Sequence, residues 1–360
     1  MTEKHAHRQE RLRERLAEAG VDAAIVPPGG DLVYLTGLHV HLSERLALLV
    51  LPTQGEAVMV LPAFEASRVP DDLEAVPWQE DEDPLPLLIA SLPKAARSLA
   101  FGERVSASEL LGVAAARPET RLLPLERITG GVRAIKDEGE IEALRSAAAA
   151  TDRAYQVLLQ QPIAGTTERE LAARLSGALR AEGLEDPFAS VASGPNAAFP
   201  HHVTGDRVIT SGDGVLFDFG GRWHGYLSDV SRTVAVVRAG ARLREVHAAV
   251  LAAQEAALAV LRPGARLGDV DAAARGSLAA AGLAEAFTHR LGHGLGLEIH
   301  EPPYLRPGND QPAEPGFVVT VEPGVYLPDE LGVRIEDDVL VTEDGCERLT
   351  QAPRELLVVD

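Results

Sequence analysis

Two aspartates on one predicted hairpin are the residues best placed to do chemistry. Residues 214–233, GVLFDFGGRWHGYLSDVSRT, hold two strand-like runs separated by a glycine-containing turn. With the turn between Trp223 and His224, Asp218 would lie directly opposite Asp229, and opposite residues in an antiparallel pair share one face. Two carboxylates on one largely apolar face repel each other, so either one holds a proton or both meet a cation.

A second acidic pair follows the same pattern near the end of the chain. Glu322 lies in VVTVEPGVY and Glu336 in GVRIEDDVLV, and strands mirrored about Asp329 would place the two glutamates opposite each other. Valine and isoleucine flank both, which is an unusual position for an unpaired carboxylate. The alternative is a pair of solvent-facing charges or ion-pair partners of Arg334. Two such pairs on two hairpins favour a shared cation site.

A histidine between glycines offers a nitrogen ligand. His293 lies in GHGLG, where glycines permit close backbone approach. His289 and His293 have the spacing of a helical zinc pair, but the glycines argue against a helix and there is no HExxH motif. One imidazole among four carboxylates suits a hard divalent ion such as Mn²⁺, with Co²⁺ or Zn²⁺ as alternatives. Cations bound by these groups would offset the mutual repulsion of the carboxylates.

The elements that must position these residues alternate between helix and strand in the first third of the chain. Helices are predicted at residues 8–20, 63–69, 84–97 and 107–116. Strands are predicted at residues 21–27, 31–38, 45–52 and 55–62. This alternation predicts a small α/β layer.

A domain boundary is expected within residues 125–136, so we place an N-terminal domain at 1–127 and a catalytic domain at 128–360. After the boundary, Asp137 is a predicted helix N-cap, and Thr167 with Glu170 forms a predicted capping box. Two later helices are predicted at 241–262 and 267–281. Each half of the second domain runs helix, helix, acidic hairpin, which indicates an internal duplication.

Composition limits the classes of partner. The chain of 360 residues has a net charge of −20, from 54 acidic and 34 basic residues. Nucleic acids and anionic membranes attract basic surfaces, so neither is expected as a partner. The single cysteine, Cys346, permits no intrachain disulfide and fits a reducing compartment. With no signal-peptide pattern at the N-terminus and no apolar run long enough to span a bilayer, a soluble cytoplasmic protein is expected.

The ordered motifs resemble those of the pita-bread metallopeptidases, and within them the Xaa-Pro group of prolidases and aminopeptidases P. The resemblance is carried by two aspartates separated by ten residues, by SGPN with PHH before them, and by THRLGHG with EIHE after them. YLTGL, LALLVLP and RAIKDEGEIEALR extend it over essentially the whole chain. It implies an α+β fold, with a small α/β N-terminal domain followed by a pita-bread domain with internal pseudo-symmetry.

The resemblance also implies a dinuclear metal site. In it Asp218 chelates one ion, His293 and Glu322 bind the other, and Asp229 and Glu336 bridge both. Four further residues match positions near the metals that contact the substrate or support the ligands: His201, His289, His300 and Arg334. The neighbouring His202 makes the choice of imidazole ambiguous, and the local motif favours His201.

The predicted reaction is hydrolysis of the peptide bond before proline, with the bridging hydroxide as nucleophile. The metal and either His300 or His289 would stabilise the oxyanion. Glu322 would carry the proton to the proline nitrogen, which has no hydrogen of its own. His201 would hold the proline side of the substrate, and Arg334 would fix Glu336 or a substrate group.

The length of the substrate stays open. A prolidase must bind the carboxylate of its dipeptide, which requires a cation. Arg45, in HVHLSER, is a candidate clamp and otherwise forms a surface salt bridge with Glu44 or a neighbour. We expect a prolidase acting on Xaa-Pro dipeptides, with an aminopeptidase P acting on longer peptides as the alternative. A non-catalytic binding module of the same fold is disfavoured because all five ligand positions are filled. The resemblance further implies a homodimer.

Overall fold

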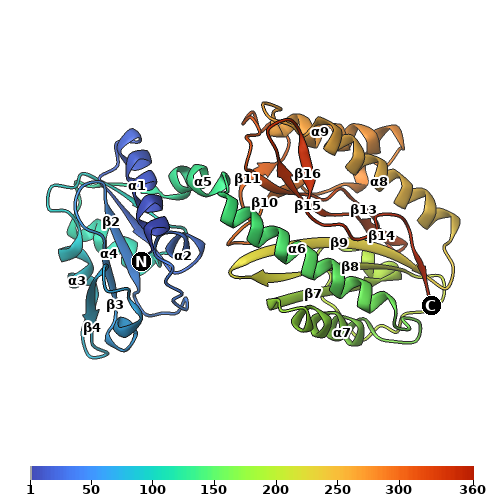
Figure 1. Ribbon diagram of the computed structural model, residues 1–360, viewed down its shortest axis with the longest axis horizontal. Helices are drawn as coiled ribbons and strands as arrows, with labels where there is room; N and C mark the ends of the chain where they lie inside the picture. Colours follow the sequence, from blue (N-terminus) through green and yellow to red (C-terminus); the bar gives the residue numbers. More distant parts are fainter. Residues whose placement is uncertain (1) are drawn as a thin grey trace. The chain divides into compact units, whose positions relative to one another are not determined.

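The computed structural model describes residues 2–360, which divide into two compact units, one ending at Arg133 and the other spanning Ala134–Asp360 (Figure 1). The first unit contains a mixed six-stranded sheet in the order β4-β3-β2-β1-β5-β6. Its strands are β1 (Ala23–Val26), β2 (Leu48–Pro52), β3 (Val58–Pro62), β4 (Glu74–Trp78), β5 (Ser98–Phe101) and β6 (Arg121–Pro124). The helices are α1 (Glu3–Glu18), α2 (Gly30–Thr36), α3 (Leu85–Ser91), α4 (Ala107–Ala116) and α5 (Glu126–Ala134), with a 3₁₀ turn, η1 (Ala63–Arg68).

The local sequence explains most of the first unit. Leu12 and Leu16 lie one turn apart on α1 and are buried, and all four residues of β1 are buried, as expected for a central strand covered on both faces. The predicted helix at 63–69 is the 3₁₀ turn η1, and the helix predicted at 84–97 is confined to α3. The sequence reading did not identify β4, β5 or β6.

The predicted strand at residues 31–38 is wrong, because DLVYLT forms helix α2. Gly37 ends this helix in the left-handed conformation, with φ 73°, and its amide donates to the carbonyl oxygen of Val33. Glycine adopts this conformation without the strain caused by a Cβ atom, which makes it a common helix terminator. A short apolar run of this kind does not by itself distinguish a buried helix from a strand.

The second unit repeats a pair of helices followed by strands. The first repeat comprises α6 (Glu138–Leu159), α7 (Glu168–Ala181), β7 (Glu185–Ser193), η2 (Gly194–Ala198), β8 (Gly214–Trp223) and β9 (Tyr226–Val236). The second comprises α8 (Ala241–Val260), α9 (Leu267–Ala280), η3 (Ala284–Ala286), β10 (Gly292–Gly294), β11 (Glu301–Leu305), β12 (Val318–Val321), β13 (Gly324–Leu327), β14 (Leu331–Arg334) and β15 (Asp337–Val341). The chain ends with β16 (Cys346–Arg348) and β17 (Val358–Val359).

These strands form three sheets, in the orders β17-β9-β8-β7, β11-β10-β12-β15-β16 and β13-β14. One hydrophobic core joins α6 and α7 to β7, β8 and β9, and another joins α8 and α9 to the strands of the second repeat. Figure 1 shows the two helix pairs on opposite sides of the strands. The acidic residues singled out by the sequence therefore lie on strands held between two helical layers.

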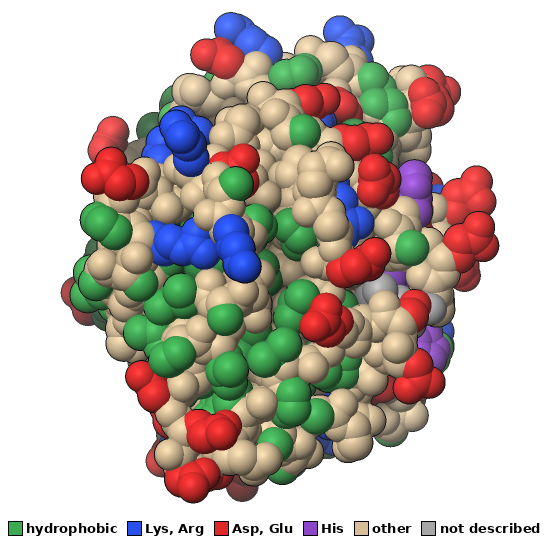
Figure 2. All heavy atoms as spheres, turned by 90° about the vertical axis from the view of Figure 1, so that its left-hand side faces the viewer, with side chains coloured by type: hydrophobic (Ala, Val, Ile, Leu, Met, Phe, Trp, Pro, Cys, Tyr) green, Lys and Arg blue, Asp and Glu red, His purple; other side chains and the backbone are tan. Residues whose placement is uncertain are grey.

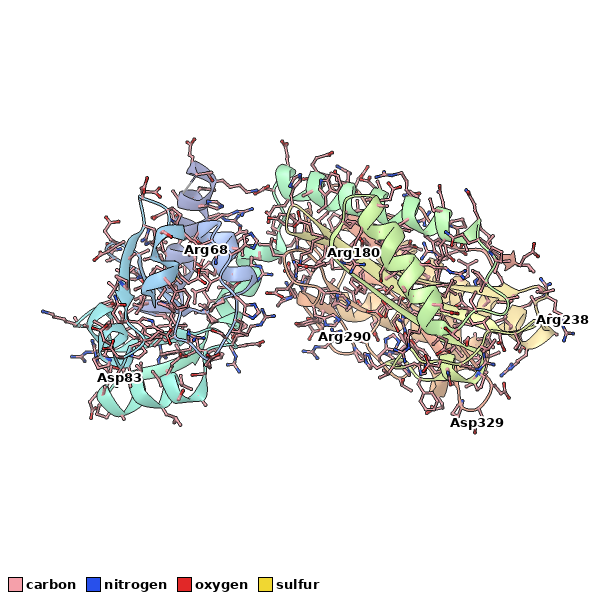
Figure 3. The ribbon with its side chains drawn as sticks, turned by 90° about the horizontal axis from the view of Figure 1, so that it is seen from below. Arg68, Asp83, Arg180, Arg238, Arg290 and Asp329 are labelled. Atoms are coloured by element: carbon pink, nitrogen blue, oxygen red, sulfur yellow. The ribbon has the colours of Figure 1, made fainter. Side chains whose placement is uncertain are left out.

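Helix starts in this unit agree with the sequence. Asp137 accepts a hydrogen bond from the amide of Glu140, and the Glu140 carboxylate accepts one from the amide of Asp137. Thr167 and Glu170 form the same reciprocal box at the start of α7. Each box satisfies amides that have no partner within the helix. Asp329, about which the β13–β14 hairpin was predicted to turn, lies at the periphery of the unit (Figure 3).

Acidic and basic side chains are interspersed with hydrophobic ones on the face drawn in Figure 2. The acidic side chains on this face are therefore solvated surface charges. None of the helices within residues 2–360 combines the length and the apolar character needed to cross a membrane.

Candidate metal centre

The first acidic pair lies on the β8–β9 hairpin in a register that differs from the predicted one. Asp218 is opposite Ser231, and Asp229 is opposite Gly220. The two-residue turn consists of His224 and Gly225, with φ values of 49° and 88°, which is the pattern of a hairpin turn whose twist matches that of the strands. The prediction of directly opposed aspartates is therefore wrong. They are offset by two residues, and because side chains alternate with a period of two, both still point from the same face.

The second acidic pair has the predicted register. Val321 is opposite Asp337 and Gly324 is opposite Arg334, so Glu322 and Glu336 face each other where both ladders are interrupted. Glu336 also forms an isolated bridge with Ser231, and Ser231 Oγ donates to Glu336 Oε2 over 2.6 Å. This bridge brings the second pair against the first hairpin.

His293 reaches the site because its strand is unusually close to its neighbours. A Cβ atom on Gly292 would lie 1.9 Å from the carbonyl oxygen of Thr320, and one on Gly294 would lie 2.4 Å from that of Pro302. Glycine on both sides of His293 is therefore a steric requirement. His293 Nε2 lies 3.4 Å from Glu322 Oε1 and 3.8 Å from Asp229 Oδ2.

The hydrogen bonds of His293 prepare Nε2 to bind a cation. Nδ1 lies 3.1 Å from the carbonyl oxygen of Gly294, so the ring proton on Nδ1 is donated there and the lone pair of Nε2 points to the acids. Burial, with a contribution from His300, lowers the pKa of His293 to about 3. The imidazole is therefore neutral at physiological pH, which is the form that binds metals.

The pKa values of the buried carboxyl groups are raised, which favours either protonation or a bound cation. Burial, followed by repulsion from Glu336 and Asp218, raises the pKa of Asp229 well above its ordinary value. Burial and the charge of Glu336 act in the same direction on the pKa of Glu322. Burial and the charge of Asp218 raise the pKa of Glu336 to about 7. Without cations, these groups resist ionising together.

The geometry fits a bound divalent ion. Ligand atoms of Asp229, His293 and Glu336 all lie within 4.8 Å of one another, and all three residues are buried. Asp218 and Glu322 line the same cavity, so the five predicted ligands are gathered at one place. Carboxylate oxygens with a single neutral imidazole form a donor set typical of hard or borderline divalent cations.

The cavity has a volume of about 400 Å³. Its lining contains every predicted catalytic and metal-binding residue, together with two that were not singled out, Pro200 and Arg290. The lining residues are Pro200, His201, Asp218, Asp229, His289, Arg290, His293, His300, Glu322, Arg334 and Glu336. Of the two adjacent histidines, His201 lines the cavity, whereas His202 Nε2 lies 2.8 Å from the buried carboxylate of Glu168. The rings of His300 and His293 meet edge to face, with centroids 4.3 Å apart.

Arg334 connects several parts of the site. Its Nη2 donates to Asp218 Oδ2 over 2.7 Å and its Nε donates to Ser231 Oγ over 2.8 Å, whereas Nε lies 3.9 Å from Glu336 Oε2. Arg334 and Glu336 therefore form a long ion pair, and hydrogen bonds through Ser231 add an indirect link. Nη1 donates to the hydroxyl of Tyr326, which lies 2.9 Å from His289 Nε2. Tyr326 was missed because nothing in its local sequence distinguishes it from a core residue.

Arg45 belongs to the first unit. Its guanidinium is bound to Glu80, with Nε 2.8 Å from Oε1, and to Glu44, with Nη1 2.6 Å from Oε1. The surface salt bridge that the sequence left open is thus present.

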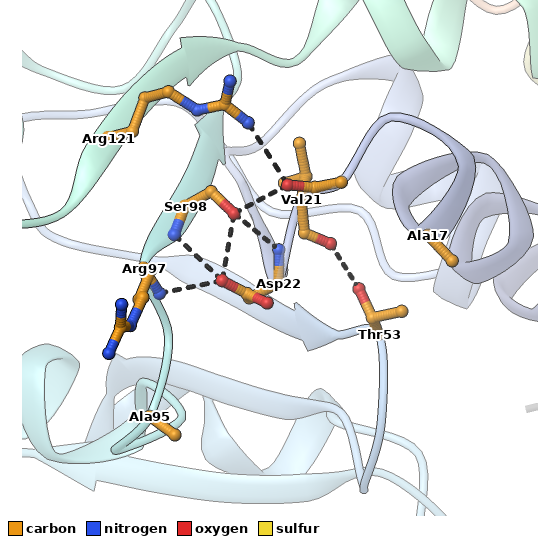
Figure 4. A pocket seen from close by; sticks show the side chains of 9 residues that line it. Ala17, Val21, Asp22, Thr53, Ala95, Arg97, Ser98 and Arg121 are labelled. Carbon is orange, nitrogen blue, oxygen red and sulfur yellow. Dashed lines mark hydrogen bonds between the residues drawn. The ribbon is translucent and has the colours of Figure 1, made fainter.

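The first unit also has a pocket at the junction of β1 and β5 (Figure 4). Asp22 accepts hydrogen bonds there from the amides of Arg97 and Ser98, which joins the two strands.

Comparisons with known proteins agree with this geometry. The family model described as metallopeptidase family M24 matches residues 142–343, and that of the creatinase/prolidase N-terminal domain matches residues 8–135. A probable dipeptidase PepE of Mycobacterium tuberculosis is 39% identical over 351 residues, covering 95% of this chain and 93% of the relative.

Solved structures extend the likeness to the whole fold. A prolidase from Thermococcus sibiricus superposes with a TM-score of 0.95 at 34% identity, and both chains are covered completely. An X-Pro aminopeptidase from Thermotoga maritima gives a TM-score of 0.85 at 33% identity, covering 98% of this chain and 99% of the other.

Fold and site together define a metal-dependent peptidase. The chain belongs to metallopeptidase family M24 and carries the creatinase/prolidase N-terminal domain. The predicted family, fold class and enzymatic character are thereby confirmed, with an α/β N-terminal part and a pita-bread catalytic part.

Proposed function

We propose that this enzyme hydrolyses the peptide bond before proline, with Xaa-Pro dipeptides as its main substrates. The observation that carries the proposal is the gathering of four carboxylates and His293 around one cavity. The chain also aligns over nearly its whole length with a dipeptidase and a prolidase. An aminopeptidase P acting on longer peptides is the second candidate, supported by the likeness to the X-Pro aminopeptidase.

Two divalent cations, Mn²⁺ by the donor set and Co²⁺ or Zn²⁺ as substitutes, would be held by Asp218, Asp229, His293, Glu322 and Glu336. When bound, they would polarise the scissile carbonyl and supply a bridging hydroxide as the nucleophile. His293 Nε2 and the oxygens of Asp229 and Glu336 already lie close enough to share one ion. Side-chain movement on binding is thus expected to be small at these three residues.

Glu322 is the proposed proton carrier. Its carboxyl lies in the cavity, where burial and the charge of Glu336 raise its pKa. A proline nitrogen leaves as an amine only after it receives a proton, and a carboxyl group with a raised pKa can take up a proton and deliver it. Thr320 Oγ1, 3.3 Å from Glu322 Oε1, holds the carboxyl in place.

The histidines of the cavity would hold the substrate. Burial, with a contribution from Arg334, lowers the pKa of His289 to about 4, so this ring is a neutral hydrogen-bonding group. His289 Nδ1 lies 2.7 Å from the carbonyl oxygen of Arg290, and its other nitrogen is held by Tyr326. His300, which packs against His293, is the better placed donor to a developing oxyanion. His201 would contact the proline side of the substrate.

Arg290 is a second candidate for binding the dipeptide carboxylate. Its guanidinium carbon lies 4.5 Å from the centroid of the Tyr304 ring, and the residue lines the cavity. Arg334, the other arginine of the lining, is already paired with Asp218. Stacking on an aromatic ring leaves the edge of a guanidinium available for a carboxylate. Arg45 remains the sequence-based candidate.

Kinetics on Ala-Pro and Ala-Pro-Ala with Mn²⁺ test the proposal. We expect higher kcat/KM for Ala-Pro, and loss of cleavage after chelation with recovery on adding the metal. A preference for Ala-Pro-Ala would instead establish the aminopeptidase. Tight metal binding without cleavage of any proline peptide would indicate a binding module. A homodimer and a cytoplasmic location are also proposed, from the family resemblance and from the single cysteine respectively.

A further inference from the structure

A buried carboxylate outside the cavity organises the segment that carries His201. Glu168 is the first residue of α7, and its side chain is completely buried. It takes no part in the capping box, which belongs to Thr167 and Glu170. Burying a charged group this deeply is unfavourable unless hydrogen bonds compensate for the lost water.

Five donors surround the Glu168 carboxylate. Oε1 accepts from the amide of Ser193 over 2.8 Å, from Ser193 Oγ over 2.7 Å and from Asn196 Nδ2 over 3.0 Å. Oε2 lies 2.8 Å from His202 Nε2 and accepts from the amide of Gly205 over 3.2 Å. A carboxylate has about four lone-pair sites, so both oxygens are fully engaged. Burial alone would raise the pKa of Glu168, but these hydrogen bonds outweigh it and lower the pKa.

All five donors come from residues 193–205, which leave β7 through η2 and return along its side. Within this stretch, His201 and Pro200 line the cavity, and neither is among the five donors to Glu168. The donors stand on both sides of His201 in sequence, so the carboxylate closes the segment into a loop. Thr204, near the end of this segment, hydrogen-bonds it to β7. Thr204 Oγ1 donates to the carbonyl oxygen of Val191 and accepts from the Val191 amide.

The same segment also contacts β14, a strand that leads into the metal centre. A Cβ atom on Gly332 would lie 1.7 Å from the carbonyl oxygen of Ala197, so η2 and β14 are in backbone contact. β14 ends at Arg334, which binds Asp218. The segment is thereby held between the Glu168 carboxylate and a strand that belongs to the metal centre.

We propose that Glu168 is a positioning residue, which sets the location of His201 in the substrate cavity through its hydrogen bonds to residues 193–205. The proposal rests on the function assigned above only in that His201 contacts the substrate. Loss of one acceptor oxygen would remove the hydrogen bonds on one side of His201, either those from Ser193 and Asn196 or those from His202 and Gly205. His201 could then move while the metal ligands stay in place. A displacement of about 1 Å at a group that orients substrate can lower turnover by about 100-fold.

A double-mutant cycle in the full-length, Mn²⁺-loaded enzyme tests this. Glu168→Gln keeps the size of the side chain but puts an NH₂ group where one oxygen accepts hydrogen bonds. We expect it to lower kcat/KM for Ala-Pro about 10-fold or more in the wild-type background, and by less than about 2-fold in a His201→Ala background. Glu170→Gln, two residues along the same helix and exposed, is the matched control and should change neither value.

An equal loss of kcat/KM in both backgrounds would overturn the proposal, because general destabilisation acts whether or not His201 is present. A second readout does not depend on catalysis. In NMR spectra of histidine-labelled protein loaded with diamagnetic Zn²⁺ in place of paramagnetic Mn²⁺, the His201 imidazole signal, identified by its absence in His201→Ala, should shift in Glu168→Gln and not in Glu170→Gln. An unmoved His201 signal contradicts the proposal even if Ala-Pro proves not to be the substrate, and a shifted one supports it in that case too.

Asn196→Ala covers the possibility that Glu168→Gln does not fold. It removes one of the three donors to Oε1 and leaves the carboxylate with four others. We expect the same pattern with a smaller change, about 3-fold in kcat/KM, because four hydrogen bonds still hold the carboxylate. Asn196→Ala with unchanged kinetics and an unchanged His201 signal would also count against the proposal.

Discussion

Replacing Glu336 by glutamine should stabilise the metal-free enzyme at neutral and alkaline pH. In the folded chain, burial and the charge of Asp218 raise the pKa of Glu336 from 4.5 to about 7. The folded state therefore retains a proton that the unfolded state gives up as pH rises. The wild-type protein has the full contribution of this group below pH 4.5 and loses it progressively as pH rises to about 7.

The magnitude follows from the shift. A change of 2.5 pKa units (7 minus 4.5), at about 1.4 kcal/mol per unit, corresponds to about 3 kcal/mol of stability lost above pH 7. The side chain of Glu336 is 3% exposed, so solvent screening does not reduce this figure appreciably. Glutamine has no charge to desolvate and keeps an acceptor for Ser231 Oγ. At about 2–4 °C per kcal/mol for a unit of this size, we expect the variant to melt about 6–12 °C higher at pH 8.

The assay is thermal and urea unfolding of both proteins in chelator, at pH values between 4.5 and 8.5. The gain in stability of Glu336→Gln over wild type should be absent at pH 4.5 and complete by about pH 8. With Mn²⁺ present the order should reverse, because the metal binds only the folded wild-type site well. Glu343→Gln, at an exposed position, is the control. A constant difference between Glu336→Gln and wild type across the whole pH range would refute the reasoning.

Three further perturbations test other parts of the second unit. Asp229→Asn removes a proposed bridging ligand and should lower activity by more than about 100-fold in metal-replete buffer; near wild-type turnover would refute its assignment. Gly292→Ala forces a Cβ atom to within 1.9 Å of a carbonyl oxygen on β12, so we expect a loss of about 3 kcal/mol of stability and weaker metal binding. An unchanged melting temperature and metal content would show that β10 can move aside. Burial, aided by the charge of Arg232, lowers the pKa of His247 from 6.5 to about 4. The stability that this neutral ring contributes is complete above pH 6.5 and should be lost as pH falls towards 4. In His247→Gln, the decrease in unfolding free energy over this pH range should be smaller by about 3 kcal/mol. The same decrease in wild type and variant would argue against a buried neutral His247.

The two acidic hairpins show how far pairing can be read from a sequence. Glu322 and Glu336 were correctly placed because the strands pair symmetrically about the predicted turn. Asp218 and Asp229 were misplaced by two residues because the turn uses His224 in a left-handed conformation. The predicted turn had Trp223 and His224 at its centre, whereas the observed turn has His224 and Gly225, one residue later. The shared face survived the error, since an even shift preserves the alternation of side chains.

Three features were available from the sequence, because each depends on residues close together in the chain or on a fixed order of motifs. They are the types and order of the five metal-ligating candidates, the family, and two helix starts, an N-cap at Asp137 and a capping box at Thr167. Only the tertiary structure showed that Arg334 binds Asp218 and Tyr326, that His202 binds Glu168, and that Arg290 lines the cavity. The contact of Arg334 with Asp218 joins strands of the two repeats, 116 residues apart, and that of His202 with Glu168 spans 34 residues within the first repeat. Both form only when elements distant in the chain pack together. The order of residues along the chain does not by itself show which distant residues will pack together.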